Sequence, residues 1–100
     1  MTKRILVTEE IADTGLNRLR QAGFEVDIQL GVSGKQFHVA LAGAHALIVR
    51  SATQVDVAAF DAGRDLVVVG RAGVGLDNID VEAATARGVM VVNAPPSNSV

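Results

Sequence analysis

The sequence predicts an α/β fold, a flavodoxin-like doubly wound parallel five-stranded sheet. Three observations support this class: short runs rich in Val and Ile recur along the 100 residues, helix-like stretches separate them, and the later runs are continuously apolar. Right-handed crossovers restrict the topology, and the favoured order of five such strands is 2-1-3-4-5. The first helix would then cover one face of the sheet, and the next three would cover the other.

Five runs are expected to be strands, because each is too short for a helix and rich in β-branched residues. These runs are Ile5–Val7, Phe24–Ile28, Ala46–Val49, Leu66–Val69 and Val89–Val92. The last three are continuous rather than alternating, which is typical of parallel strands buried on both faces.

The helices between these strands carry local start and stop signals. Thr8 is expected to cap the first helix, with Glu9 and Glu10 stabilising its dipole in the first turn and Gly23 ending it. The signals for the others are a capping box of Ser33 and Gln36 for the second, Thr53 with Asp56 and then Gly63 for the third, and Asp80 and then Gly88 for the fourth.

The end of the chain breaks this alternation. After the fifth strand, Asn93–Pro96 reads as a turn, and Ser97–Val100 resembles a helix cap without its helix. We therefore expect a fragment that lacks its final covering helix, with an open apolar face over the third to fifth strands. Such a face favours self-association, so we predict a homo-oligomer. The alternative is a small complete domain with a frayed tail.

Composition excludes several classes of function. Nine Lys and Arg are scattered among eleven Asp and Glu, for a net charge of −2, so there is no basic patch for nucleic acid. The absence of Cys excludes disulfides and thiolate zinc sites, and it suits a cytoplasmic protein. The longest stretch without charged residues, Gln36–Val49, is shorter than the ~18 apolar residues of a membrane span. The start of the chain does not resemble a signal peptide.

Ligands of open parallel sheets bind at the carboxyl ends of the strands, and two arginines lie there. Arg50 and Arg71 each follow a predicted strand directly, and Ser51 and Thr53 add hydroxyl groups. Two guanidinium groups at neighbouring strand ends could hold one anion, because arginine binds carboxylate and phosphate with two parallel hydrogen bonds. The alternative is that both are ordinary surface residues.

The stretch from Gly70 to Asn78 is the densest glycine cluster in the chain. Glycines let backbone N–H groups approach an anion closely, so this segment could form an anion-binding nest. Gly73-Val74-Gly75 also imitates the dinucleotide fingerprint. Asn78 replaces its third glycine, however, and no acidic residue follows the next strand, so we reject that assignment. A glycine-rich turn without a ligand remains the alternative.

Two further kinds of site, a phospho-acceptor site and a histidine site, are excluded by individual residues. The glutamates after the first strand suggest a phospho-acceptor receiver domain, but Arg50 and Asn93 occupy the places of its required Asp and Lys. His38 and His45 have no acidic residue at ligand or triad spacing. We therefore predict that both histidines are ordinary surface or packing residues and that the sequence holds no metal site.

Two blocks, Leu47–Thr53 and Val69–Asn93, resemble the N-terminal part of D-2-hydroxyacid dehydrogenases, and within them the branch that acts on 3-phosphoglycerate. Ala94–Val100 continues the match, with Pro96 at a variable position, and the first forty residues match in pattern only. The resemblance implies a split substrate-binding domain, interrupted after this chain by a Rossmann domain that binds NAD. It also implies oxidation of 3-phosphoglycerate at its 2-hydroxyl, with hydride passing to NAD, in serine biosynthesis.

The resemblance also assigns roles to individual residues. It implies substrate-binding positions at Arg50, Ser51, Arg71, Val74, Gly75 and Asn98. Val74 would also lie close to the nicotinamide. The family's catalytic His, Glu and Arg and its true fingerprint fall outside these 100 residues, so this chain alone is expected to be inactive and not to bind NAD detectably. Alternatives are a relative acting on glyoxylate, hydroxypyruvate or D-lactate, and a stand-alone module that binds a small anion.

Overall fold

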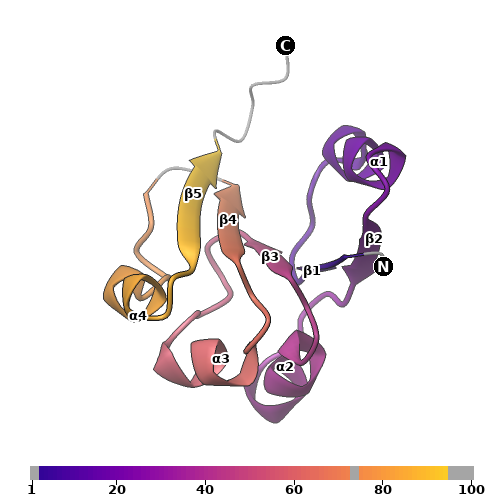
Figure 1. Cartoon of the computed structure of the whole chain (residues 1–100). Helices are drawn as coiled ribbons and strands as arrows, with labels where there is room; N and C mark the ends of the chain where they lie inside the picture. The colour runs from indigo at the N-terminus through magenta and orange to yellow at the C-terminus, as the bar shows by residue number, and fades with distance from the viewer. Residues whose placement is uncertain (1–2, 73–74, 95–100) are drawn as a thin grey trace.

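The computed structural model describes residues 3–72 and 75–94, and within these ranges it contains five strands and four helices (Figure 1). In chain order they are β1 (Arg4–Val7), α1 (Asp13–Gln21), β2 (Glu25–Ile28), α2 (Gly34–Leu41), β3 (Ala46–Val49), α3 (Val57–Ala62), β4 (Val68–Ala72), α4 (Val81–Ala86) and β5 (Met90–Ala94). All paired strands are parallel, and their order is β2-β1-β3-β4-β5. This confirms the predicted fold class and strand order.

The helices divide between the two faces of the sheet as predicted, with α1 on one side and α2, α3 and α4 on the other (Figure 1). The larger core lies under the three helices, where Leu6, Leu47 and Val69 of the sheet are fully buried and meet Phe37 and Phe60. Burying each large apolar side chain contributes roughly 1.5–3 kcal/mol. The three-helix face therefore supplies most of the apolar stabilisation.

The opposite face is covered only in part. Ile5 and Val7 of β1 pack with Leu16 of α1 in a second, smaller core. On β5, which lies three strands further along the sheet from β1, Met90 and Val92 are 63% and 42% exposed. The described part of the chain thus leaves the β4–β5 face open. The expectation of an uncovered apolar face is confirmed there. The prediction that the continuously apolar strands are buried on both faces is wrong for β5, because one of its faces is exposed.

The fourth strand is shifted from its predicted position. It spans Val68–Ala72 rather than Leu66–Val69, because Gly70 and Arg71 pair with β3 on one side and with β5 on the other. Pairing with two neighbouring strands outweighs the weak strand propensity of glycine. Arg71 therefore lies inside β4 and not in the loop that follows it.

Two helix caps are confirmed and two are wrong. The carboxylates of Asp56 and Asp80 accept N–H hydrogen bonds in the first turns of α3 and α4, both at 3.0 Å. Thr53 does not take part in the α3 cap. Ser33 stands at the N-cap of α2, but its side chain makes no capping hydrogen bond, so the predicted capping box does not form.

The start of α1 also differs from its prediction. This helix begins at Asp13, with Ala12 at its N-cap, whereas Thr8 is buried in front of it. Glu9 and Glu10 consequently lie before the helix and not in its first turn. Gly23 follows the end of α1 with a φ of +97°, a left-handed conformation that favours glycine. None of the four helices in the described residues is long and apolar enough to cross a membrane.

Candidate functional site

Three loops meet at the carboxyl edge of the sheet, after β1, β3 and β4. The loop after β3 carries Arg50 and Ser51, whose side chains are both exposed. The guanidinium of Arg50 donates a long hydrogen bond of 3.4 Å to the carbonyl oxygen of Glu10 in the loop after β1. The two polar residues that the sequence singled out thus lie on the surface, at the edge where ligands of such sheets bind.

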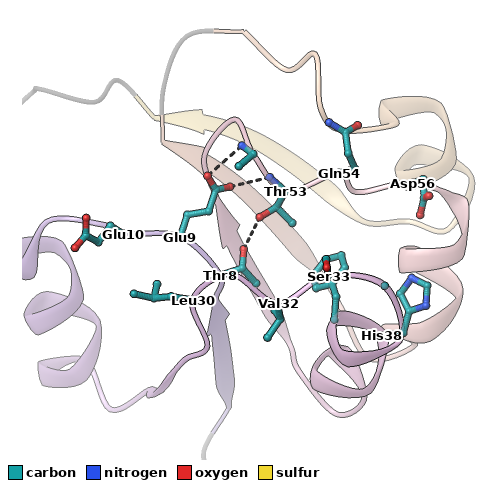
Figure 2. Close-up of a pocket in the computed structure, with 14 residues that line it drawn as sticks. Thr8, Glu9, Glu10, Leu30, Val32, Ser33, His38, Thr53, Gln54 and Asp56 are labelled. Carbon is teal, nitrogen blue, oxygen red and sulfur yellow. Dashed lines mark hydrogen bonds between the residues drawn. The ribbon is translucent and has the colours of Figure 1, made fainter.

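The carboxylate of Glu9 fixes the loop after β3. One of its oxygens accepts hydrogen bonds from the backbone N–H groups of Arg50 (2.6 Å) and Thr53 (3.1 Å), and the other accepts one from Ala52 (3.1 Å). Figure 2 shows this carboxylate directed at the loop that carries Thr53. Three N–H groups converging on one anion form a nest, here filled by a side chain of the protein itself.

These hydrogen bonds change the acidity of Glu9. Partial burial acts to raise its pKa, but the N–H groups of Arg50, Ala52 and Thr53 and the hydroxyl of Thr53 oppose this, and the net pKa of Glu9 is lowered. Glu9 is therefore a carboxylate at neutral pH. Beneath it, the buried hydroxyls of Thr8 and Thr53 are 2.9 Å apart and hydrogen-bonded (Figure 2).

Asn78 holds the same loop from the opposite side. Its side chain is only 6% exposed, and its Nδ2 donates to the carbonyl oxygens of Arg50 and Thr53, both at 2.6 Å. The backbone continues this connection, because Val55 donates to the carbonyl of Asn78 at 2.9 Å and bridges to Ile79. The residue that replaced the third glycine of the fingerprint is therefore a buried structural amide.

The loop after β4 approaches Arg71 closely. Gly75 has a φ of +87°, and a Cβ atom placed on it would lie 3.3 Å from Nη1 of Arg71. The side-chain amide of Asn93, which pairs with Arg71 across the sheet, donates to the carbonyl oxygen of Gly75 at 2.9 Å. The structure thus brings Arg71 and Gly75 together.

The predicted clamp of two arginines stays a prediction, since the described neighbours of the two side chains lie in different loops. Arg50 contacts the loop after β1, whereas Arg71 lies beside Gly75 in the loop after β4. Val74 and Asn98, the other two predicted positions, lie outside the described residues. Glu9 and Asn78 were missed as site residues, because their partners are 25 to 44 positions away in the sequence.

A cavity of about 630 Å³ opens beside this site, between the loops after β1, β2 and β3 and the start of α2 (Figure 2). Its lining includes the carboxyl side chains of Glu9, Glu10 and Asp56 together with His38, and its described lining contains no Lys or Arg. Like charges repel in a partly desolvated site, so this cavity is a poor place for a multiply charged anion. The described residues also contain no group of three side chains able to hold a metal ion.

Comparison with protein families gives a match over almost the whole chain. The model of the catalytic domain of D-isomer specific 2-hydroxyacid dehydrogenases covers residues 5–100. The chain is 41% identical over 97 residues to D-3-phosphoglycerate dehydrogenase of Archaeoglobus fulgidus, and 49% identical over 98 residues to the chloroplastic D-3-phosphoglycerate dehydrogenase 2 of Arabidopsis thaliana. Each match covers 97% of this chain but only 18% and 16% of the relative. The chain thus spans less than a fifth of the length of these relatives.

Solved structures give the same result. The NAD⁺-bound 3-phosphoglycerate dehydrogenase of Entamoeba histolytica matches with a TM-score of 0.81 and 29% identity, over 93% of this chain and 33% of that one. The NADPH-dependent glyoxylate/hydroxypyruvate reductase of Sinorhizobium meliloti matches with a TM-score of 0.74 and 30% identity, over 95% of this chain and 29% of that one.

Proposed function

The chain belongs to the D-isomer specific 2-hydroxyacid dehydrogenase family, and we propose that it forms the substrate-binding part of a member that oxidises 3-phosphoglycerate to 3-phosphohydroxypyruvate with NAD, in serine biosynthesis. Residues 1–100 would be the N-terminal segment of the substrate-binding domain, and the Rossmann domain that binds NAD would lie in other parts of the protein. The phosphoglycerate dehydrogenases that match at 41% and 49% identity support this choice of substrate.

The observation that carries the proposal is the fixed loop after β3. Glu9 and Asn78 hold its backbone, and Arg50 and Ser51 remain on the exposed side. A guanidinium and a hydroxyl on a rigid loop suit a substrate with a carboxylate and a phosphate, since charge-assisted hydrogen bonds are the strong ones. We propose that Arg50 neutralises a substrate anion and that Ser51 donates to it.

The neighbouring loop completes the proposed site. Backbone N–H groups of Val74 and Gly75 would hold the substrate carboxylate, with Val74 also near the nicotinamide. Arg71 and Asn98 would support anion binding. The left-handed backbone of Gly75 and its contact with Arg71 support this part of the proposal, because they place a guanidinium directly against the glycine loop.

The described residues do not fit a binding site for the dinucleotide. Asn78 is buried against the loop after β3, in the place of the third fingerprint glycine, which would let a helix pack closely against the sheet. Oxidation of the 2-hydroxyl would need a base for the hydroxyl proton, while the cofactor would accept the hydride from C2. His45 accepts a hydrogen bond from the Arg4 N–H, and His38 lies in the acidic cavity. We therefore assign no catalytic residue here and propose that the base lies outside this chain.

The glyoxylate/hydroxypyruvate reductase of similar structure supports a second candidate, a member that acts on an unphosphorylated 2-hydroxy acid. Steady-state kinetics of the complete gene product with NAD separate the two. We expect kcat/KM for 3-phosphoglycerate to exceed that for D-glycerate or D-lactate by about 100-fold or more, as two or more charge-assisted contacts would give. Equal values, or a preference for the unphosphorylated acid, would overturn the phosphate assignment.

The stand-alone module is tested with the 100-residue chain. We expect this chain to show no turnover with 3-phosphoglycerate and NAD. Calorimetric titration of the chain with 3-phosphoglycerate at micromolar affinity would favour the anion-binding module instead. A cytoplasmic location and a homo-oligomeric state complete the proposal. Of the two curated relatives described above, one is named chloroplastic, so fractionation of the source cells is the test of location.

A further inference from the structure

We propose that Glu9 is a positioning residue, which presents Ser51 and Arg50 to the substrate by gathering the other backbone N–H groups of their loop. This inference rests on the proposed substrate site. Glu9 would not touch the substrate, and it would act only through the loop after β3.

The pattern of hydrogen bonds along the loop carries the inference. Glu9 takes the N–H groups of Arg50, Ala52 and Thr53, but not that of Ser51. Within residues 3–72 and 75–94, no acceptor binds the Ser51 N–H, and the residue is exposed. Between Arg50 and Thr53, Ser51 is thus the residue whose N–H is left for a group outside the described part of the fold.

The carbonyl side of the loop is held as firmly as the N–H side. Asn78 donates to the carbonyls of Arg50 and Thr53, on the two sides of Ser51 and Ala52. With both sides held, the loop has little freedom to turn another N–H outward. The side chain of Glu9 therefore decides which donor faces the open edge.

The chemistry of the nest strengthens this assignment. Three converging N–H groups would otherwise attract the anionic substrate itself, and Glu9 prevents this by filling the nest. The substrate anion is left with Arg50, with Ser51 and with the loop after β4. Glu9 would thereby keep the anion in its productive position and out of a competing position that lies one loop residue away.

The test is a double-mutant cycle in the complete gene product, with kcat/KM for the preferred 2-hydroxy acid as the readout. In Glu9→Gln the amide keeps the size of the side chain but turns an NH2 group toward at least one loop N–H. We expect Glu9→Gln and Ser51→Ala each to lower kcat/KM about 10-fold, as misplacing a binding group does. Ser51→Ala removes the hydroxyl of Ser51, whereas Glu9→Gln misplaces the whole residue, so both weaken the contact between Ser51 and the substrate. We therefore expect the double variant to lose less than about 30-fold, well below the product of the two. Losses that multiply to about 100-fold would overturn the proposal.

The matched control is Glu10→Gln. It removes the same charge one residue away, from a side chain that makes no hydrogen bond within the described residues, and we expect less than a 2-fold change. If Glu10→Gln matches the loss in Glu9→Gln, the effect is one of charge and not of position. Should Glu9→Gln fail to fold, Glu9→Asp keeps the carboxylate and is measured in the same cycle with Ser51→Ala, with the same criterion.

Amide hydrogen exchange measures the order of the loop after β3 directly and does not depend on enzyme activity. We expect the peptide that contains residues 50–55 to exchange at least 10-fold faster in Glu9→Gln, and to be unchanged in Glu10→Gln. Unchanged exchange in Glu9→Gln would refute the positioning role even if activity fell. A failure of the phosphoglycerate assignment would be seen separately, in the wild-type substrate preference, because the cycle is measured with whichever acid the wild type prefers.

Discussion

The carboxyl edge of the sheet has two unlike halves. The half beside β1 and β2 opens into a cavity of about 630 Å³ whose described lining carries three carboxyl side chains and no Lys or Arg. The half beside β3 and β4 carries Arg50, Ser51, Arg71 and Gly75. The proposed anionic substrate fits the charge and the hydrogen-bond donors of the β3–β4 half better than it fits the acidic cavity.

Glu9 stands at the boundary between these halves. It lines the cavity, yet its carboxylate is bound to the backbone of the loop after β3. Its charge is thereby directed into the protein and away from the proposed anion site. The difference between the halves depends on this single side chain and on Asn78, which holds the loop from the other side.

The largest expected effect follows from Asn78→Ala. The buried amide donates to two backbone carbonyls, and its removal leaves both without a partner, so we expect a loss of about 2–4 kcal/mol in the free energy of unfolding. Urea denaturation of the 100-residue chain measures this loss. The control is Asp77→Asn at the exposed neighbouring position, with an expected change within about 0.5 kcal/mol. A loss below 1 kcal/mol in Asn78→Ala would show that the loop does not depend on the amide.

A smaller loss is expected from Gly75→Ala. The added methyl group would sit in a left-handed backbone conformation and 3.3 Å from the Arg71 guanidinium, which costs about 1–2 kcal/mol. Gly31→Ala is the matched control, because its φ of +78° is similar while a Cβ there would meet nothing within 4 Å. If the contact with Arg71 matters, Gly75→Ala is the more destabilised of the two in thermal unfolding. Equal losses would mean that only the backbone conformation is being tested.

Acid should lower the stability of the folded chain through protonation of Glu9. Its hydrogen bonds lower its pKa in the folded chain relative to the ordinary value of 4.5, so its contribution to stability is present above that value. The contribution is lost as the pH falls through the lowered pKa. The neighbouring charges are the Arg50 guanidinium and the Glu10 carboxylate, and both remain in Glu9→Gln.

The measurement is urea unfolding of wild type and Glu9→Gln at pH 7 and at pH 3. We expect the wild type to be more stable at pH 7, and the difference between the two proteins to shrink at pH 3. A difference that is the same at both values would contradict the lowered pKa.

The smallest effect on stability is expected at the open β4–β5 face. Met90 and Val92 are largely exposed, so Met90→Lys combined with Val92→Thr should change the free energy of unfolding by no more than about 0.5 kcal/mol per substitution. The same pair should reduce self-association of the 100-residue chain, measured by sedimentation at high concentration. A wild-type chain that stays monomeric there would refute the predicted association through this face.

How far the sequence predicted the molecule depends on the distance between interacting residues. The strand order followed from apolar runs and crossover geometry, and Asp56 and Asp80 were identified as caps because each bonds only three residues ahead. Glu9 looked like a residue of a first helical turn, since nothing near it reveals partners more than forty positions away. The end of β4 was missed for the same reason, because Gly70 and Arg71 become strand residues only between two neighbouring strands.

The site was predicted in the same way. Arg50 and Ser51 were chosen as candidate site residues because they directly follow an apolar run, and the structure places both at the exposed carboxyl edge of the sheet. Asn78 was noticed only as a departure from the dinucleotide fingerprint. Its role as a clamp depends on where the loop after β3 ends up in space, which no local pattern encodes.

The central claim is that the β3–β4 half of the edge binds the phosphate-bearing anion, and Arg50→Ala tests it most directly. In the complete gene product, we expect this change to lower kcat/KM for 3-phosphoglycerate by about 10- to 100-fold more than for D-glycerate, as loss of one charge-assisted contact does. Arg64→Ala, at an exposed position beyond α3, is the control and should change both values less than 2-fold. Equal losses for the two acids in Arg50→Ala would contradict the claim.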